Sequence, residues 1–331
     1  MIFSKWAGLY QGNRRDIVEY VFSSMKKLLS YTVSIVLPNW NGVELLKKNL
    51  PSVIAASPNS EIIVADDASD DGSVEFLQKN YPQVQIVTNR TRQGFAGNVN
   101  SGVAVAHGEI VVLLNTDVRP QRQFLSTVLP HFDNPNMFAV GCLEKSHETA
   151  GVIHRGRGIA RWEKGYFIHA KGEVDKRDTA WVSGGSAAYR RAMWEQLGGM
   201  DTIFNPFYWE DIDLSYRAKK AGWDITFEPK SVVEHFHDQG TIRSSYTKND
   251  VKRIVYRNQY LFIWKNISDF SLVLSHIVWT PIRLLQGVLN GDLLMIQGYL
   301  WACTKLWAIG KCRSRDRGLW KKKDNQLFPI I

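Results

Sequence analysis

The chain has 331 residues, of which 44% are hydrophobic and 22% are charged, a composition typical of one large folded domain or one domain with an appendage. Its three cysteines are widely spaced, which excludes a disulfide framework and a cysteine-rich metal site and is typical of a reducing compartment. The net charge of +9 lies at the ends of the chain, because residues 1–30 carry +3 and residues 305–323 carry +7. Since nucleic-acid enzymes more often spread positive charge over a domain face, we expect no nucleic-acid partner.

Short apolar runs alternate with helical patterns from residue 31 onward. Val-rich and Ile-rich runs bounded by turn residues predict buried strands at 33–37, 61–65, 84–88 and 109–114. Helical spacing is found between them, at 43–55, 73–80 and 95–107. This alternation predicts an α/β domain with a mainly parallel sheet and helices on both faces. Its active site is expected at the carboxyl ends of the strands.

Polar residues follow three of these strands. Pro38 and Asn39 come after the first, and an acidic pair, Asp66 and Asp67, comes after the second. Asp117, in "NTDV", follows the fourth strand. Each acid could simply cap a turn or helix. Alternatively, the pair could bind a nucleobase or ribose, and Asp117 could hold a divalent cation that clamps a diphosphate, because Mg²⁺ and Mn²⁺ prefer oxygen ligands.

Residues 89–108 place Arg92 beside Gly94 at a predicted helix start. Glycine permits close backbone approach, and a helix N-terminus next to an arginine favours phosphate. Neither G-x-G-x-x-G nor G-x-x-x-x-G-K-[ST] occurs in the chain. Their absence argues against a dinucleotide-binding dehydrogenase and against a P-loop nucleotidase.

The second half of the chain is more varied. Residues 140–180 are weakly periodic and are interpreted as a substrate-facing insertion or a surface excursion. Residues 181–199 predict a strand, a glycine turn and a helix closed by Gly198 and Gly199. After residue 250 the pattern is helical, with strongly apolar stretches at 270–289 and 293–309.

The stretch "NPFYWEDIDLSYRAKKAGW", residues 205–223, crowds three carboxylates behind two aromatic residues. Asp213 and Arg217 stand four residues apart, which predicts an ion pair within a helix. Glu210 favours the helix dipole and can orient its neighbour. Asp211 lacks an obvious structural partner, and poor solvation beside Trp209 would raise its pKa. We therefore interpret Asp211 as a catalytic base, with a helix cap as the alternative.

The order of these loops, ending in "WEDIDLSYRAKKAGW", resembles the family-two glycosyltransferases with a GT-A fold, especially their bacterial rhamnosyltransferase-like branch. The resemblance covers roughly residues 31–265. It implies inverting transfer of a sugar from a nucleotide-diphosphate donor, with Asp211 as the general base assisted by Glu210. It also implies a Rossmann-like mixed sheet, here followed by C-terminal amphipathic helices.

The same resemblance assigns the other site residues. The segment 115–117 stands at the metal-binding D-x-D motif, with Asn115 in place of the first Asp, so that Asp117 is the chief ligand of Mg²⁺ or Mn²⁺. A metal-contacting or diphosphate-contacting His is expected at His235, with His237 left open. Donor-binding residues are expected at Pro38, Asn39, Asp66, Asp67, Arg92, Gly94, Asn100, Asn115 and Thr116. Residues of the acceptor side are expected at Gly184, Gly185 and Trp209.

These observations predict three regions: a basic N-terminal extension (1–30), a GT-A catalytic domain (31–265) and a basic helical C-terminal region (266–331). In the last, positions 270, 273, 274, 277, 281, 284, 285 and 288 form an apolar stripe. Pro281 and Arg283 argue against a membrane span. We expect docking on an anionic membrane surface, with packing on the catalytic domain or a second subunit as the alternatives. Charged residues in 1–30 argue against a signal peptide, so a cytoplasmic protein at the inner membrane face is expected.

Two other functions share parts of this pattern. A sugar-phosphate nucleotidyltransferase would want a basic, glycine-rich loop after its first strand, and none precedes Lys47. A nucleotide-sugar-binding protein without catalysis would not need both Asp117 and Asp211. The acceptor is expected to be a glycan or a lipid-linked saccharide, and the donor a deoxythymidine-diphosphate rhamnose or a uridine-diphosphate sugar.

Overall fold

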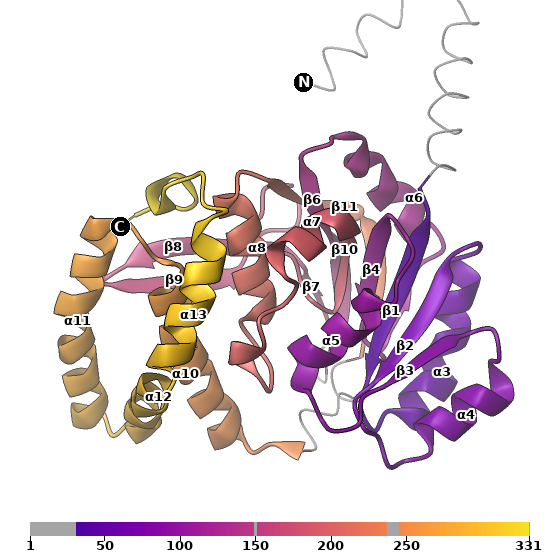
Figure 1. The fold of residues 1–331 in the computed structure, drawn as a ribbon, viewed down its shortest axis with the longest axis horizontal. Helices are drawn as coiled ribbons and strands as arrows, with labels where there is room; N and C mark the ends of the chain where they lie inside the picture. Colours follow the sequence, from indigo (N-terminus) through magenta and orange to yellow (C-terminus); the bar gives the residue numbers. More distant parts are fainter. Residues whose placement is uncertain (1–30, 149–150, 237–244, 331) are drawn as a thin grey trace, which may run out of the picture.

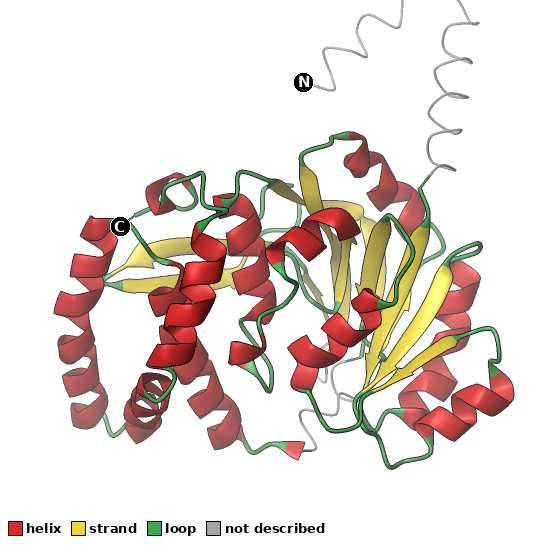
Figure 2. Ribbon diagram, viewed as in Figure 1, coloured by secondary structure: helices red, strands yellow, loops and turns green. Residues whose placement is uncertain are grey.

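The computed structural model describes residues 31–148, 151–236 and 245–330. The predicted extension 1–30 and His237 lie outside these residues. In Figure 1 the chain runs from a sheet flanked by helices, in indigo and purple, to a group of helices in orange and yellow at the opposite end of the molecule. The same elements are coloured by type in Figure 2.

The first part of the chain forms the predicted parallel strands and helices. The strands are β1 (Val33–Asn39), β2 (Glu61–Asp66), β3 (Gln85–Thr88) and β4 (Ile110–Leu114). The helices between them are α3 (Val43–Ala56), α4 (Ser73–Asn80) and α5 (Gly94–Ala104). The strands lie in the order β3-β2-β1-β4 and all pair in parallel. The prediction for this region is confirmed, with boundaries that differ by three residues at most.

The sheet continues past β4 with strands of both directions. Its remaining members are β5 (Val118–Pro120), β6 (Met137–Glu148), β7 (Gly151–Arg155), β10 (Ser186–Arg190) and β11 (Asp224–His235). β10 runs antiparallel between β4 and β6, whereas β11 is parallel to β6. The mixed, mainly parallel sheet of a GT-A fold is confirmed. Because β10 is reversed, its first residue pairs with the last residue of β4, at the edge where the parallel strands end.

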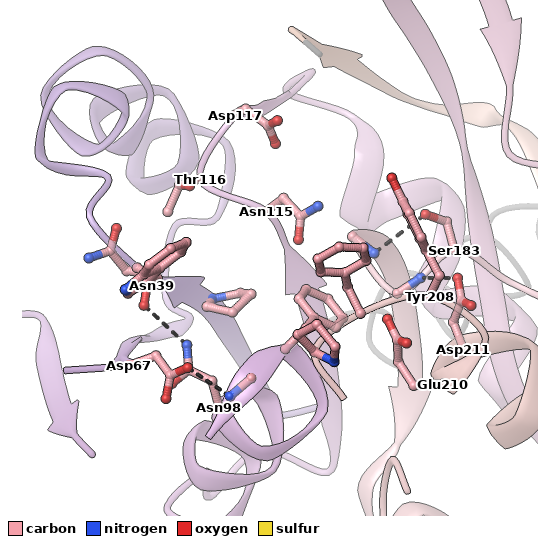
Figure 3. Close-up of a pocket in the computed structure, with 18 of the residues that line it drawn as sticks. Asn39, Asp67, Asn98, Asn115, Thr116, Asp117, Ser183, Tyr208, Glu210 and Asp211 are labelled. Carbon is pink, nitrogen blue, oxygen red and sulfur yellow. Dashed lines mark hydrogen bonds between the residues drawn. The ribbon is translucent and has the colours of Figure 1, made fainter. Parts of the chain in front are cut away.

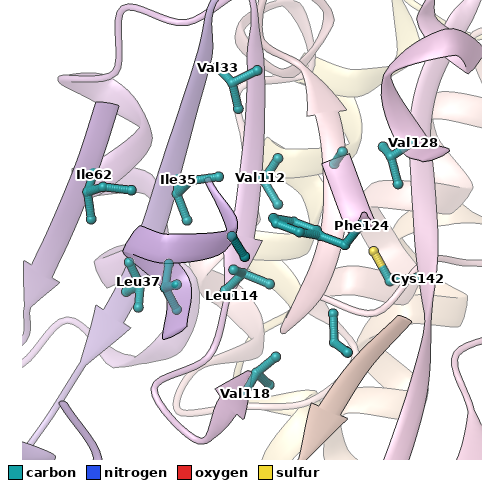
Figure 4. Packing of buried hydrophobic residues seen from close by; sticks show 14 of the residues in the cluster. Val33, Ile35, Leu37, Ile62, Val112, Leu114, Val118, Phe124, Val128 and Cys142 are labelled. Carbon is teal, nitrogen blue, oxygen red and sulfur yellow. The ribbon is translucent and has the colours of Figure 1, made fainter. Parts of the chain in front are cut away.

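Two apolar layers cover the faces of the sheet. In β1, Ile35 and Leu37 enter one cluster and Val36 enters the other, as expected where successive side chains point to opposite faces. Figure 4 shows the first cluster, in which Val112 and Leu114 of β4 lie beside Phe124 of α6 (Phe124–Val128). The short helix η1 (Leu129–Asp133) follows α6. The two clusters bury the sheet and fix the edge that carries the site.

Three sequence-based predictions of secondary structure are wrong. Residues 140–180 are not an insertion, because they supply most of β6 and the hairpin β8 (Gly158–Glu163) and β9 (Tyr166–Lys171). In 181–199 the glycine turn precedes the strand, β10, which leads directly into α7 (Arg191–Leu197). The apolar stretch 293–309 is divided between α12 (Leu293–Cys303) and α13 (Leu306–Arg317).

The C-terminal helices are joined to the catalytic domain through a third, aromatic-rich cluster. α8 (Glu210–Lys220), α10 (Lys248–Asn266) and α11 (Phe270–Leu289) all contribute to it, together with the hairpin β8–β9. The predicted ion pair between Asp213 and Arg217 is confirmed at 2.7 Å. The same Asp213 receives Lys265 of α10 at 2.7 Å, and Lys265 also contacts Asp316 of α13 at 3.1 Å. This buried network fastens α8, α10 and α13 together.

Part of the predicted basic tail is therefore internal. Arg313 donates to the main-chain oxygen of Ile267 at 2.7 Å, and Arg315 pairs with Asp201 at 2.9 Å. A short helix, η4 (Asp324–Gln326), ends the described chain, and the carboxylate of its Asp324 pairs with Lys220 at 2.6 Å. Packing of this region on the catalytic domain, one of the alternatives, is confirmed for the inner faces of these helices.

Candidate active site

A cavity of about 330 Å³ opens at the edge where β1, β2 and β4 end and β10 begins. Figure 3 shows its two sides: Asn39, Asp67 and Asn98 on one, and Ser183, Tyr208, Glu210 and Asp211 on the other, with Asn115 between them. Of the residues predicted from the sequence, those that line it are Pro38, Asn39, Asp67, Arg92, Gly94, Asn115, Thr116, Asp117, Gly184, Gly185, Glu210, Asp211 and His235. The loops therefore meet as expected from a parallel sheet.

Asp67 anchors the start of α5 to the pocket wall. Its carboxylate accepts hydrogen bonds from the backbone N–H groups of Gln93 (2.7 Å) and Gly94 (2.9 Å) and from the side chain of Asn89 (3.0 Å). Gly94 has a φ of +72°, a left-handed conformation that favours glycine. Across the mouth, the Arg92 guanidinium lies 3.2 Å from the centre of the Trp40 ring. This side of the pocket thus combines a cation, an aromatic face and a helix N-terminus.

Asp66, Asn100 and Trp209 do not line the pocket. Asp66 is buried below it, where its carboxylate accepts from the side chains of Asn39 (2.8 Å) and Ser69 (2.6 Å). Asn100 ties α5 to the turn after α7 by two hydrogen bonds to the backbone of Met200. Trp209 packs into the aromatic cluster, and its neighbour Tyr208 takes the place at the cavity. These three residues shape the site from behind.

Asp117 and His235 lie together on the wall near the end of β4. The Nε2 atom of His235 is 3.2 Å from Oδ1 of Asp117, and its Nδ1 atom is 3.3 Å from Oε2 of Glu144. Burial alone would lower the pKa of His235, but the two carboxylates raise it to about 10. Burial would likewise raise the pKa of Glu144, yet hydrogen bonds from His235 and Ser186 and the charge of His235 lower it to about 2. The His235 ring is therefore a charged imidazolium that lies between the carboxylates of Asp117 and Glu144.

The turn Gly184–Gly185 allows a close approach between β4 and α8. A Cβ atom on Gly185 would lie 2.4 Å from Nδ2 of Asn115, and one on Gly184 would lie 3.4 Å from Cβ of Asp211. The N–H of Gly184 donates to Oδ2 of Asp211 at 3.2 Å. A side chain at Gly185 would displace Asn115 from the centre of the cavity.

Glu210 and Asp211 begin α8 at the opposite wall. Burial raises the pKa of Glu210 to about 8, and the charge of Asp211 adds to the increase. Burial also raises the pKa of Asp211, whereas hydrogen bonds from the N–H groups of Gly184 and Ile212 act in the opposite direction. Among the described residues, Oε2 of Glu210 has no hydrogen-bond partner. Asp211 is therefore the member of the pair whose anion is better stabilised.

The segment before this pair is held in a strained conformation. Tyr208 and Trp209 both have positive φ, +69° and +77°, which is uncommon for large side chains and often found at functional sites. Asn258 of α10 donates from its single side-chain amide group to the main-chain oxygens of Phe204 (2.9 Å), Phe207 (3.1 Å) and Tyr208 (2.8 Å). A buried residue of the helical region thus fixes the loop that presents the acids.

Arg257 supports the same loop. Its guanidinium donates to the main-chain oxygens of Phe204 and Asn205 and lies 4.0 Å from the centre of the Trp301 ring on α12. It forms no ion pair with a carboxylate in the described part of the chain, and burial lowers its pKa to about 10. Trp301 therefore connects the C-terminal helices with the acidic wall of the cavity.

Nine lining residues were not predicted, among them Asn98, Glu144, Ser183 and Tyr208. Asn98 could have been found, because it stands four residues after Gly94 on the same helical face. Glu144 could not, since it reaches the cavity only through the register that places β6 beside β10 and β11.

The donor groups near Asp117 fit a divalent cation in part. Within residues 31–148, 151–236 and 245–330, no three His, Cys, Asp or Glu side chains are grouped so that they could hold a metal ion. Asp117, His235 and the amide oxygen of Asn115 nevertheless line one cavity, and that oxygen is buried without a hydrogen-bond partner in the described structure. Because Mg²⁺ commonly takes only one or two protein ligands and completes its shell with substrate phosphates and water, these residues suit a cation that arrives with a diphosphate.

Comparison with known proteins gives a consistent result. Residues 34–198 match the model of glycosyl transferase family 2. The N-acetylglucosaminyl-diphospho-decaprenol L-rhamnosyltransferase of Mycobacterium tuberculosis is 26% identical over 55% of this chain and 68% of its own length. The O-antigen chain rhamnosyltransferase WbaN of Salmonella anatum is 25% identical over 54% of this chain and 57% of its own. A pre-mycofactocin glycosyltransferase of M. tuberculosis is 24% identical, and the match spans only 43% of that relative.

Solved structures share the fold. GalNAc-T7, described with UDP, GalNAc and Mn²⁺, superposes with a TM-score of 0.59 at 18% identity, over 72% of this chain and 48% of its own. The mannosyltransferase PcManGT from Pyrobaculum calidifontis, in complex with GDP-Man and Mn²⁺, gives a TM-score of 0.51 at 16% identity, over 91% of this chain and 95% of its own. These likenesses extend beyond the residues that match the family model.

Proposed function

We propose that this chain, a member of glycosyltransferase family 2, is an inverting glycosyltransferase that moves a sugar from a nucleotide-diphosphate donor to an acceptor hydroxyl. The observation that carries the proposal is the arrangement of a single cavity. A wall that carries the Arg92 guanidinium, suited to phosphate, faces a buried acidic wall, Glu210 and Asp211, with Asn115 and Asp117 between them. A sugar bound between the two walls would have its diphosphate on one side and a base on the other.

Donor binding falls to the first wall. Pro38, Asn39 and Asp67 would contact the nucleoside, while the Arg92 guanidinium would face the phosphates. The N–H groups of Gln93 and Gly94 already donate to Asp67 and would position the loop instead. Asp66 would act indirectly, because its hydrogen bonds to Asn39 and Ser69 hold the loop that carries the wall. Thr116 and Asn115 would border the sugar.

The acceptor hydroxyl would be activated by Asp211. Its carboxylate takes the proton while the hydroxyl oxygen forms a bond to the anomeric carbon, and the bond from that carbon to the diphosphate oxygen breaks. Two adjacent buried carboxylates resist ionising together, so Glu210, with its pKa raised to about 8, holds a proton at neutral pH. Asp211 therefore remains the anion of the pair, steadied by the N–H of Gly184.

Asp117 and the amide oxygen of Asn115 would hold Mg²⁺ or Mn²⁺, and His235 would join them after losing its proton, because a ligating imidazole is neutral. When bound, such a cation neutralises the charge of the departing diphosphate. Glu144 would orient His235 through its Nδ1 atom, as carboxylates commonly do for metal-bound histidines.

For the donor sugar we propose rhamnose, from deoxythymidine-diphosphate rhamnose, because two relatives are described as rhamnosyltransferases. One of these acts on a diphospho-decaprenol, which supports a glycan or lipid-linked acceptor in cell-surface polysaccharide synthesis here. Such an acceptor would place the protein in the cytoplasm, peripherally on the inner face of the cell membrane. A uridine-diphosphate sugar is the alternative donor.

A thermal-shift panel of nucleotide sugars, with Mn²⁺ and with excess chelator, tests donor and cation together. A donor at 100 times its Kd stabilises the fold by about 2.7 kcal/mol, and we expect this only for one nucleotide class and only with the cation. Asp117→Ala should abolish the shift and turnover, whereas Asp70→Ala, at an exposed acid of the nearby loop, should change neither. Full activity in chelator would refute the cation assignment; no nucleotide-sugar binding and no turnover would refute the transferase.

A further inference from the structure

One face of α11 is exposed and almost entirely apolar. Eight large side chains along it are between 40% and 80% exposed. They are Phe270, Leu274, Ile277, Val278, Ile282, Leu285, Val288 and Leu289. Their spacing repeats every three or four residues, so they form one stripe along the full 20-residue helix. Solvent-exposed apolar patches of this extent mark interaction sites in soluble domains.

The two helices that follow expose further large apolar side chains. α12 exposes Leu293 and Leu300, and the start of α13 exposes Leu306 and Trp307, the last to 75%. α11 packs on α12, and both lie at the end of the molecule away from β1–β3 (Figure 1). We call the α11 stripe together with these four residues the outer apolar surface.

The opposite face of α11 is held to the catalytic domain by polar contacts. His276 donates from Nδ1 to the main-chain oxygen of Gly165 at 2.7 Å, and its Nε2 accepts from the indole of Trp264 at 2.9 Å. Arg283 lies 4.4 Å from the centre of the Tyr166 ring in the β8–β9 hairpin. By length and composition α11 could cross a membrane, and no other helix in the described ranges could. A crossing would break these contacts and leave their polar groups in hydrocarbon, where they are costly.

The charges around the outer apolar surface are positive. Residues 270–317 contain two carboxylates, and both have partners: Asp292 pairs with Lys252 at 2.9 Å and Asp316 with Lys265 at 3.1 Å. Lys305 and Lys311 are exposed beside Trp307, and the Lys311 ammonium lies 3.5 Å from the centre of the indole. An exposed tryptophan beside lysines is typical of segments at a membrane interface.

We propose that the outer apolar surface docks on an anionic phospholipid leaflet, with α11 lying in the plane of the membrane. The apolar stripe would enter the boundary between headgroups and acyl chains, and Lys305 and Lys311 would meet anionic headgroups, which supplies the two signals that stable peripheral binding requires. A second copy of the chain is a poorer occupant, because it would bring the same positive groups against each other. The proposal stands apart from sugar transfer, since it holds for any acceptor.

Co-sedimentation of the full chain with vesicles tests the proposal. We expect binding to vesicles that contain phosphatidylglycerol, weaker binding as salt increases, and little binding to phosphatidylcholine alone. Ile277→Gln combined with Leu285→Gln should reduce partitioning by about tenfold or more, since each removes a large apolar side chain from the interface. Val152→Gln, at an equally exposed apolar residue of β7, should leave it unchanged.

Three results would overturn this assignment. Protein that remains in the supernatant with every vesicle would refute membrane docking. A concentration-dependent dimer without vesicle binding, dispersed by the double substitution, would assign the surface to a second copy. Vesicle-bound protein released only by detergent, and not by high salt or carbonate, would mean that α11 spans. Donor hydrolysis by the double variant, measured in solution, should equal that of the wild type whichever result is found.

Discussion

Two pairs of adjacent carboxylates lie near opposite walls of the cavity, and they differ in what surrounds them. Asp66, the last residue of β2, and Asp67 receive hydrogen bonds from three side chains and from the N–H groups of Ser69, Gln93 and Gly94. Glu210 and Asp211 begin α8 with fewer donors around them, and burial raises the pKa of both. Oε2 of Glu210 lacks any partner within the described ranges.

The difference shows how a pair of adjacent carboxylates can serve either of two purposes, depending on the groups around it. Where N–H and amide donors surround a carboxylate, its charge is stabilised and it organises a loop. Where few donors surround a buried carboxylate, it gains affinity for a proton, which suits a base. In this protein the donor-poor pair, Glu210 and Asp211, directly follows the strained backbone of Tyr208 and Trp209, which Asn258 holds in place.

The sharpest test removes the proton acceptor and keeps its shape. In Asp211→Asn we expect kcat to fall by a factor of about 10²–10⁴ while donor affinity is retained. Because Asn keeps an oxygen that can accept from the N–H of Gly184, the free energy of unfolding should stay within about 1 kcal/mol of wild type. The wild-type rate should increase with pH through the raised pKa of Asp211. An unfolded variant, or a folded one with full activity, would show that Asp211 is only a helix cap.

The other pair should respond in stability more than in catalysis. Asp66→Ala removes the acceptor of three hydrogen bonds and leaves buried donors of Asn39 and Ser69 unpaired. We expect a loss of about 2–4 kcal/mol in the free energy of unfolding, measured by urea denaturation. At a temperature where the variant is folded, kcat should change less than in Asp211→Asn. A larger loss of kcat would place Asp66 in the reaction.

Glu210 allows a test in which removing a charge stabilises the protein. Its pKa is raised on folding, so its contribution to stability is complete below the unfolded pKa, near 4.5, and is lost as pH rises through about 8. Glu210→Gln does not titrate. The free energy of unfolding of the variant minus that of wild type should therefore be larger at pH 8 than at pH 4.5, by about 1 kcal/mol or more. Equal pH dependence in both proteins would mean that Glu210 ionises freely.

The smallest expected effects are those of substitutions at two asparagines of α5, Asn98 and Asn100. Asn100 bonds only to the backbone of Met200 outside the cavity, whereas Asn98 lines the cavity and holds the main-chain oxygen of Ala65 at 2.8 Å. Asn100→Ala should lower the free energy of unfolding by about 1 kcal/mol and leave donor affinity unchanged. Asn98→Ala should weaken donor binding several-fold in the same titration. The reverse result would restore Asn100 as the donor-binding residue.

The sequence was informative where structure is local. The strands β1, β2 and β4 are short Val-rich and Ile-rich runs, and the polar residues after them reach one edge because parallel strands require it. The pair Glu210–Asp211 was found for a similar reason, as acids beside aromatic residues at a helix start. Such features depend on a few neighbouring residues.

Features that depend on distant pairing were missed. β6 contains Gly, Lys and His after its apolar start, so its burial becomes visible only when β10 and β11 are placed on either side of it. The sequence analysis named Asn100 where the cavity is lined by Asn98. The two residues point to different faces of α5, and the pattern did not show which face lies toward the cavity. The apolar stretch 293–309 is divided between two helices at Thr304 and Lys305, although no proline marks the division.

The clamp made by Arg257 and Asn258 has a consequence for anyone who would recombine this protein with a relative. The family model ends at residue 198, which invites a junction after β10 and α7. The carbonyls that the clamp holds belong to residues 204–208, and Trp301 supports it from α12. A chimaera that exchanged the C-terminal helices alone would inherit a loop without its matching clamp. Loop and helices should therefore be transplanted as one cassette, with the crossover placed before residue 200 and not after 245.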